Sequence, residues 1–139
     1  MIECITGKKG KGKTKHLLEK VRYSLINPKG SIVYLDKSPQ HMYELDPRVR
    51  LIDVSDYGPK DKYEFYGFIL GILSQNHDVE KVFLDSFLDI SFCKKEDIPD
   101  FIYKLEDISD RFDTDFIISI SADINELPEE VHKYVTVSL

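Results

Sequence analysis

The chain of 139 residues is 42% hydrophobic and 32% charged, proportions that describe a globular protein and argue against a disordered one. Its length suits a single domain, residues 1–139, large enough to bury a core without disulfides or metals. The longest apolar run, residues 65–73, is too short to cross a bilayer, so we expect no membrane span.

The net charge of −6 is unevenly distributed along the chain. Residues 1–30 contain eight Lys or Arg and two Asp or Glu, so this end is basic, whereas the remainder is strongly acidic. A basic end raises the local concentration of an anionic ligand. The acidic remainder argues against a broad nucleic-acid surface, although a narrow basic rim near the N-terminus could still contact nucleic acid.

The first predicted element is a short buried strand, residues 2–5, followed by a loop and a helix. Leu17, Leu18, Val21 and Leu25 share one face of a helix that begins near Lys13. The N-terminal end of this helix points a positive dipole at the loop before it.

The loop itself, residues 7–14, matches the phosphate-loop pattern G-x-x-x-x-G-K-[ST]. Its glycines tolerate positive φ, so the backbone can turn its N–H groups toward a phosphate. Lys13 is predicted to reach the β- and γ-phosphates and Thr14 to bind Mg²⁺. The predicted nucleotide-binding residues are Gly7, Lys8, Lys9, Gly10, Lys11, Gly12, Lys13, Thr14 and Lys15. The alternative interpretation is a basic surface turn that matches the pattern by chance.

Two further strands are predicted before residue 60, with a helix between them. Residues 32–35 form a continuous apolar strand that ends at Asp36. Ser38-Pro39 then resembles a helix start, which predicts a short helix over residues 38–45. Residues 49–54 are predicted to form the next strand, and a turn-rich loop follows.

The second half of the chain alternates helices and strands. Apolar spacing predicts helices over residues 61–76 and 97–112, the latter with Asp97 as N-cap. The aromatic side chains of the first helix could form a base-stacking platform, but their helical spacing favours a core role. Strands are predicted at residues 82–85, 116–121 and 134–137. The fold class is therefore α/β: three α/β/α layers around a mostly parallel sheet of about six strands.

Ligands of such sheets bind at the C-terminal ends of the strands, where several polar residues are expected. Asp85 ends a strand and could hold Mg²⁺ beside Thr14, although turn aspartates are also common there. Asp36 is the candidate catalytic carboxylate that orients a water, with a solvated strand-end acid as the alternative. Ser121, and similarly Ser119, could sense the γ-phosphate.

The order of these motifs resembles the RecA-like P-loop ATPases, particularly the KaiC and RadA branch. The matching stretches are residues 7–14, 34–39, 51–53, 65–73 and 83–86. The resemblance implies a minimal single-domain ATP-binding core with ATP and Mg²⁺ as cofactors.

Two features of that family bear on catalysis and assembly. Where family members have a pair of glutamates, this chain has Asp36-Lys37, so the resemblance implies ATP binding more directly than ATP hydrolysis. Arginines that act across a subunit interface are common in the family. A homo-oligomer is therefore a further hypothesis, and Arg48, Arg50 and Arg111 are the candidates for an arginine that acts across its interface.

Three functions follow as hypotheses. The first is a cytoplasmic Mg-ATP-binding protein, consistent with isolated Cys4 and Cys93 and no signal peptide, acting as a slow ATPase or as a nucleotide-dependent switch on a protein partner. The second is a transferase, because residues 10–14 also resemble the loop of corrinoid adenosyltransferases. The third is a nucleotide-binding module that has lost its chemistry. Adenine is favoured because no guanine-reading Asn/Thr-Lys-x-Asp signature is present.

Overall fold

A six-stranded sheet forms the centre of the computed structural model, which describes all residues 1–139. Its strand order is β3-β2-β4-β5-β1-β6, and every neighbouring pair is parallel. The strands are β1 (Ile2–Thr6), β2 (Ser31–Asp36), β3 (Val49–Asp53), β4 (Val79–Leu84), β5 (Asp115–Ile120) and β6 (Val135–Ser138). The helices are α1 (Lys13–Ser24), α2 (Lys62–Gln75), α3 (Phe87–Ser91) and α4 (Ile98–Phe112).

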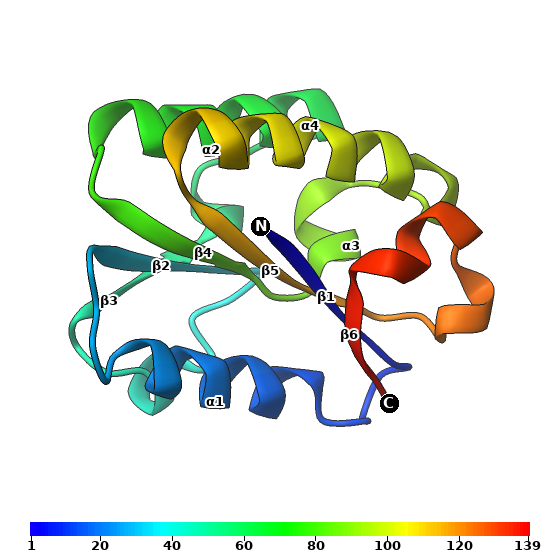
Figure 1. Cartoon of the computed structure of the whole chain (residues 1–139), viewed down its shortest axis with the longest axis horizontal. Coiled ribbons are helices and arrows are strands. Elements are labelled where there is room, and N and C mark those ends of the chain that lie inside the picture. The colour runs from blue at the N-terminus through cyan, green and yellow to red at the C-terminus, as the bar shows by residue number, and fades with distance from the viewer.

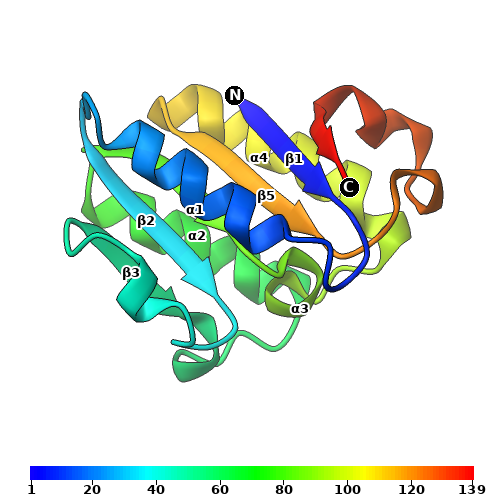
Figure 2. The same cartoon turned by 90° about the horizontal axis from the view of Figure 1, so that it is seen from below.

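Helices cover both faces of the sheet, as the alternation of elements predicted (Figures 1 and 2). Helix α1 lies alone on one face, whereas α2 and α4 lie side by side on the other (Figure 1). The larger core cluster contains 26 buried residues contributed by the sheet and by α2, α3 and α4. The smaller cluster, between α1 and the sheet, contains nine. The three-layer α/β arrangement is therefore present, with its larger core on the side away from α1.

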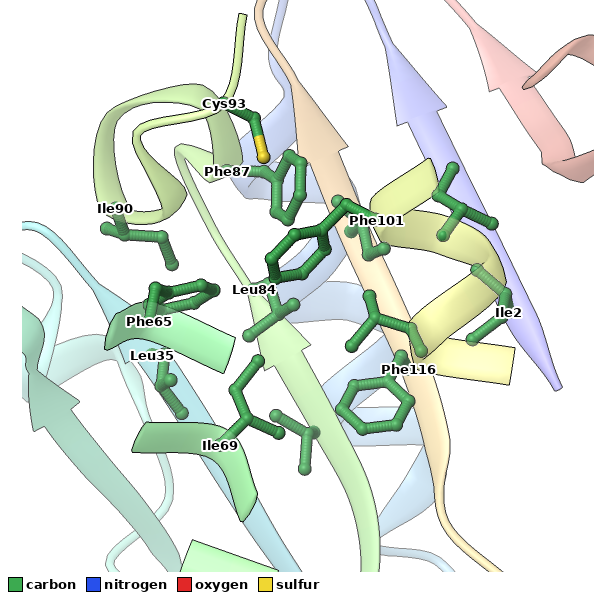
Figure 3. Close-up of a cluster of buried hydrophobic side chains, with 14 of the residues drawn as sticks. Ile2, Leu35, Phe65, Ile69, Leu84, Phe87, Ile90, Cys93, Phe101 and Phe116 are labelled. Carbon is green, nitrogen blue, oxygen red and sulfur yellow. The ribbon is translucent and has the colours of Figure 1, made fainter. Parts of the chain in front are cut away.

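The helical aromatic side chains belong to this larger core. The ring of Phe101 in α4 lies 5.9 Å from that of Phe65 and 5.4 Å from that of Phe87 (Figure 3). Phe65 and Phe87 are fully buried. The core role predicted for the aromatic residues of α2 is confirmed for Phe65, whereas Tyr63 on the same helix is exposed.

The predicted helix over residues 38–45 is wrong. That segment contains only a single 3₁₀ turn, Met42–Glu44, with no buried residue. Ser38 accepts a hydrogen bond from the backbone of Gln40, but no apolar stripe follows it that could pack on the sheet. Short helices are marginal without such packing. The segment therefore stays a polar loop beside the C-terminal edge of β2.

Smaller differences concern element ends. Val54 leaves the strand and begins a 3₁₀ turn, and the short helix α3 directly after Ser86 was not predicted. Asp97 precedes α4 as expected, but its carboxylate makes no capping bond to that helix and instead pairs with Lys62. None of the helices combines the length and the apolar composition that a membrane crossing needs.

Candidate functional site

The glycine-rich loop joins β1 to α1, as the pattern requires. Gly10 and Gly12 have φ values of 82° and 93°, in the left-handed region that favours glycine. Gly7 meets a different constraint, because a Cβ there would lie 2.9 Å from the Cβ of Leu139. The N–H of Gly7 donates to the carbonyl of Ala122 (2.9 Å), which ties the loop to the segment after β5.

Several backbone N–H groups of this loop and of the first turn of α1 have no acceptor within the chain. They belong to Lys8, Lys9, Gly10, Gly12, Lys13, Thr14 and Lys15. Helix α1 also has no side-chain cap and no acidic residue in its first turn. Unpaired N–H groups at a helix N-terminus, with the positive end of the helix dipole, form an anion-binding surface.

The amine of Lys13 adds a buried positive charge to this surface. The residue is only 7% exposed, and its Nζ donates to the backbone carbonyl of Lys8 (3.1 Å). Burial lowers the pKa of Lys13, Asp85 opposes that shift, and Lys9 adds to it. No carboxylate forms an ion pair with this amine, so its charge is available to an anionic ligand.

Asp85 lies directly after β4, and its carboxylate accepts four hydrogen bonds. Oδ2 accepts from the hydroxyls of Thr14 (2.9 Å) and Tyr34 (2.7 Å). Oδ1 accepts from the hydroxyl of Ser119 (2.6 Å) and from the N–H of Ser86 (2.9 Å). A carboxylate offers about four lone-pair sites, so Asp85 is fully bonded within the chain. These contacts connect β2, β4, β5 and α1 at one carboxylate.

Asp36, the last residue of β2, is 3% exposed. Its Oδ1 accepts from the backbone N–H of Lys37 (2.7 Å), and no donor reaches Oδ2. Burial, and then the negative charge of Asp85, raise the pKa of Asp36 to about 6. Lys37 also lines the pocket, but its Nζ pairs with Asp89 of α3 (3.2 Å).

These residues surround one pocket of about 260 Å³, and none of its lining residues is hydrophobic. It is lined by Lys9, Gly10, Gly12, Lys13, Thr14, Asp36, Lys37, Ser38, Gln40, His41, Asp85, Ser86, Ser119 and Ser121. Larger hollows of about 500 and 420 Å³ lie elsewhere, and neither adjoins the loop or the two aspartates.

The pocket therefore collects most of the predicted site, but not all of it. Of the predicted binding residues, Gly7, Lys8, Lys11 and Lys15 do not line it. Ser121 does line it, whereas Ser119 makes the direct contact to Asp85. The arginines considered for a subunit interface lie away from it: Arg48 pairs with Asp46, Arg111 pairs with Asp107, and Arg50 is exposed.

Several residues of the site were not predicted as site residues from the sequence: Ser38, Gln40, His41 and Ser86 line the pocket, and Tyr34 contacts Asp85. Tyr34 stands two positions before Asp36 on β2, so the alternation of a strand places both on the same face. That signal was available in the sequence. His41 had no such signal, because its position depends on the loop that replaces the expected helix. One ligand atom each of Asp36, His41 and Asp85 lie within 4.8 Å of one another.

The donor set of the pocket fits a phosphorylated ligand with a divalent cation. Free N–H groups and the amine of Lys13 suit phosphate oxygens, and the hydroxyl of Thr14 with the carboxylate of Asp85 suits Mg²⁺. The absence of apolar lining offers no surface for a nucleobase within the pocket. No protein-family model matches this chain, and a search of curated proteins finds no relative.

Proposed function

We propose that the chain is a Mg-ATP-binding protein of the RecA-like P-loop type. The observation that carries the proposal is the set of unpaired N–H groups around buried Lys13, directly beside the Thr14 to Asp85 contact. A neutral ligand would leave the charge of Lys13 unmatched in a buried position. A polyphosphate would accept from the N–H groups and neutralise the amine together.

The cation would be held by Thr14 and Asp85. The hydroxyl of Thr14 donates its hydrogen to Asp85, which leaves the lone pairs of its oxygen available to an ion. Because Asp85 already accepts four hydrogen bonds, it would hold Mg²⁺ through water, or directly after losing one of those donors. Bound Mg²⁺ neutralises charge that develops on the phosphates.

Asp36 is the residue that would orient an attacking water. Its Oδ2 has no donor and its side chain lines the pocket, whereas the amine of Lys37 pairs with Asp89. A carboxylate with a raised pKa close to neutral is suited to accept a proton. These contacts favour a slow ATPase over a module without chemistry. The nucleobase would lie outside the polar pocket.

Thermal unfolding with and without Mg-ATP tests the binding. A ligand at one hundred times its Kd stabilises a protein by about 2.7 kcal/mol, so we expect a clear rise in Tm. Lys13→Ala should abolish the rise, and Lys133→Ala, an exposed lysine outside both the glycine-rich loop and the pocket, should retain it. An unchanged Tm for the parent protein would refute nucleotide binding.

Phosphate release tests the chemistry separately. We expect slow release that Asp36→Asn abolishes while the Mg-ATP shift in Tm remains. Binding without any release would leave the nucleotide-dependent switch or the inactive module. Consumption of ATP that requires cobalamin would indicate the adenosyltransferase instead.

A further inference from the structure

We propose that Asp36, His41 and Asp85 form a site for a divalent transition-metal ion, represented by Zn²⁺, that binds without nucleotide. The site lies at the edge of the pocket already described, but it uses no phosphate contact and no residue of the glycine-rich loop. Its nitrogen ligand distinguishes it from the oxygen-only Mg²⁺ site proposed at Thr14 and Asp85.

Two neighbouring strand ends and one loop bring the three residues together. Asp36 ends β2 and Asp85 follows β4, and these strands are neighbours in the parallel sheet. His41 lies in the loop after β2, which folds back over the same edge. Their ligand atoms lie within 4.8 Å of one another. Ligands about 2.1 Å from one ion are separated by at most ~4.2 Å, so any ligand pair separated by more than that draws together on binding.

Neither of the two carboxylates has a salt-bridge partner. Asp36 is 3% exposed and Asp85 is 2% exposed, yet neither forms a salt bridge with any Lys, Arg or His. Asp36 also has an oxygen, Oδ2, that no donor in the chain reaches, although its side chain lines the pocket. Buried charges in proteins are paired or coordinate metals. A cation between the two carboxylates would satisfy that unpartnered oxygen and offset their repulsion.

His41 is held as a metal ligand would be. Its Nδ1 lies 2.5 Å from the carboxylate of Glu44, three residues later on the 3₁₀ turn. This contact leaves Nε2 as the ring nitrogen available for an ion. Carboxylate, histidine and metal in this order are a common arrangement, because the carboxylate fixes the tautomer and increases ligand basicity.

The ligand set selects the class of ion. Imidazole nitrogen suits Zn²⁺ and related transition metals, whereas Mg²⁺ prefers an all-oxygen octahedron and retains several waters. Two carboxylates and one imidazole give three protein ligands, and water would complete a four-coordinate site. For Asp85 to bind directly, the hydroxyl of Thr14 or Tyr34 would release Oδ2.

Calorimetric titration of the nucleotide-free protein with Zn²⁺ tests the site, and Co²⁺ serves as a spectroscopic probe through its visible absorption. We expect one ion per chain and weaker binding of Mg²⁺ than of Zn²⁺. His41→Ala should weaken Zn²⁺ binding at least tenfold and abolish the Co²⁺ spectrum, and Glu44→Gln should weaken binding about 10- to 100-fold. His77→Ala, an exposed histidine in the turn between α2 and β4, is the matched control and should bind as the parent does.

Several results would overturn the proposal: no binding of one Zn²⁺ per chain, equal affinity in His41→Ala and the parent, or loss of binding in His77→Ala. Circular dichroism checks that each variant is folded. We expect Glu44→Gln to fold, because Glu44 is exposed. The Mg-ATP shift in Tm is measured on the same variants. A Mg-ATP shift in a parent protein that binds no Zn²⁺ would leave nucleotide binding intact and refute only the transition-metal site.

Discussion

Tyr34→Phe removes one donor from Asp85 and changes almost nothing else. Tyr34 is fully buried, and its ring stacks on that of Phe83 with centroids 6.0 Å apart. Phenylalanine retains this stacking and lacks only the hydroxyl that donates to Oδ2 of Asp85 at 2.7 Å. The substitution therefore isolates a single hydrogen bond to a buried carboxylate.

The magnitude follows from the charge of the acceptor. Hydrogen bonds to charged groups contribute about 1.5–3 kcal/mol, and an unsatisfied buried acceptor loses a comparable amount. Asp85 retains three donors in the variant, from Thr14, Ser86 and Ser119. We therefore expect the free energy of unfolding to fall by about 1.5–2 kcal/mol, or a decrease in Tm of roughly 5–7 °C for a chain of this size.

A double-mutant cycle in urea separates this hydrogen bond from general effects on packing. The four proteins are the parent, Tyr34→Phe, Asp85→Asn and the double variant. If the hydroxyl stabilises the protein through the carboxylate, Tyr34→Phe should cost at least about 1 kcal/mol less in the Asp85→Asn background. Additive effects within about 0.5 kcal/mol would refute the assigned contact.

The remaining predictions concern charge and close backbone approach. Folding raises the pKa of Asp36 from 3.8 to about 6, so the native state holds the proton more tightly and stability falls as pH rises through this range. Asp36→Asn should therefore be more stable than the parent at pH 7.5 by about 1–2 kcal/mol, after allowance for solvent at the pocket mouth, and equal near pH 4 in urea unfolding. A difference that does not change with pH would contradict this. Gly30→Ala should destabilise by about 1–3 kcal/mol, because its Cβ would lie 2.2 Å from the carbonyl oxygen of Asp78. Gly67→Ala, on α2 with open space around it, should stabilise by about 0.5–1 kcal/mol in the same assay, and a loss of stability there would show that its surroundings are closed.

Local sequence was sufficient for most of the elements. Apolar runs and helical spacing predicted all six strands and the three long helices, because each element buries a face that its own residues define. The segment over residues 38–45 misled the prediction, since Ser38-Pro39 supplies a helix start but no residue after it in the segment is buried, and of these only Leu45 packs partly against the core. Helix α3 is five residues long and follows Ser86 in a left-handed conformation, too short to show a period.

Part of the candidate site could likewise be predicted from the sequence, and part could not. The glycine-rich loop, Lys13 and Thr14 were recognisable from spacing alone, because their pattern is contiguous in the sequence and the positive φ values of Gly10 and Gly12 are a local backbone requirement. Asp36 and Asp85 were also identifiable as strand-end acids. Both Asp36 and Lys37 line the pocket, but the pairing of the Lys37 amine with Asp89 could not be predicted from the sequence, because it depends on where α3 lies.

What the sequence by itself determined is the composition of one edge of the molecule: a basic glycine-rich loop and two acids that end apolar strands. The tertiary structure alone decided the contacts among them. The order of the strands places Tyr34, Ser119 and Thr14 around the single carboxylate of Asp85, although the first two come from different strands far apart in the chain. Strand order and register arise from the packing of whole layers, so no local pattern encodes them.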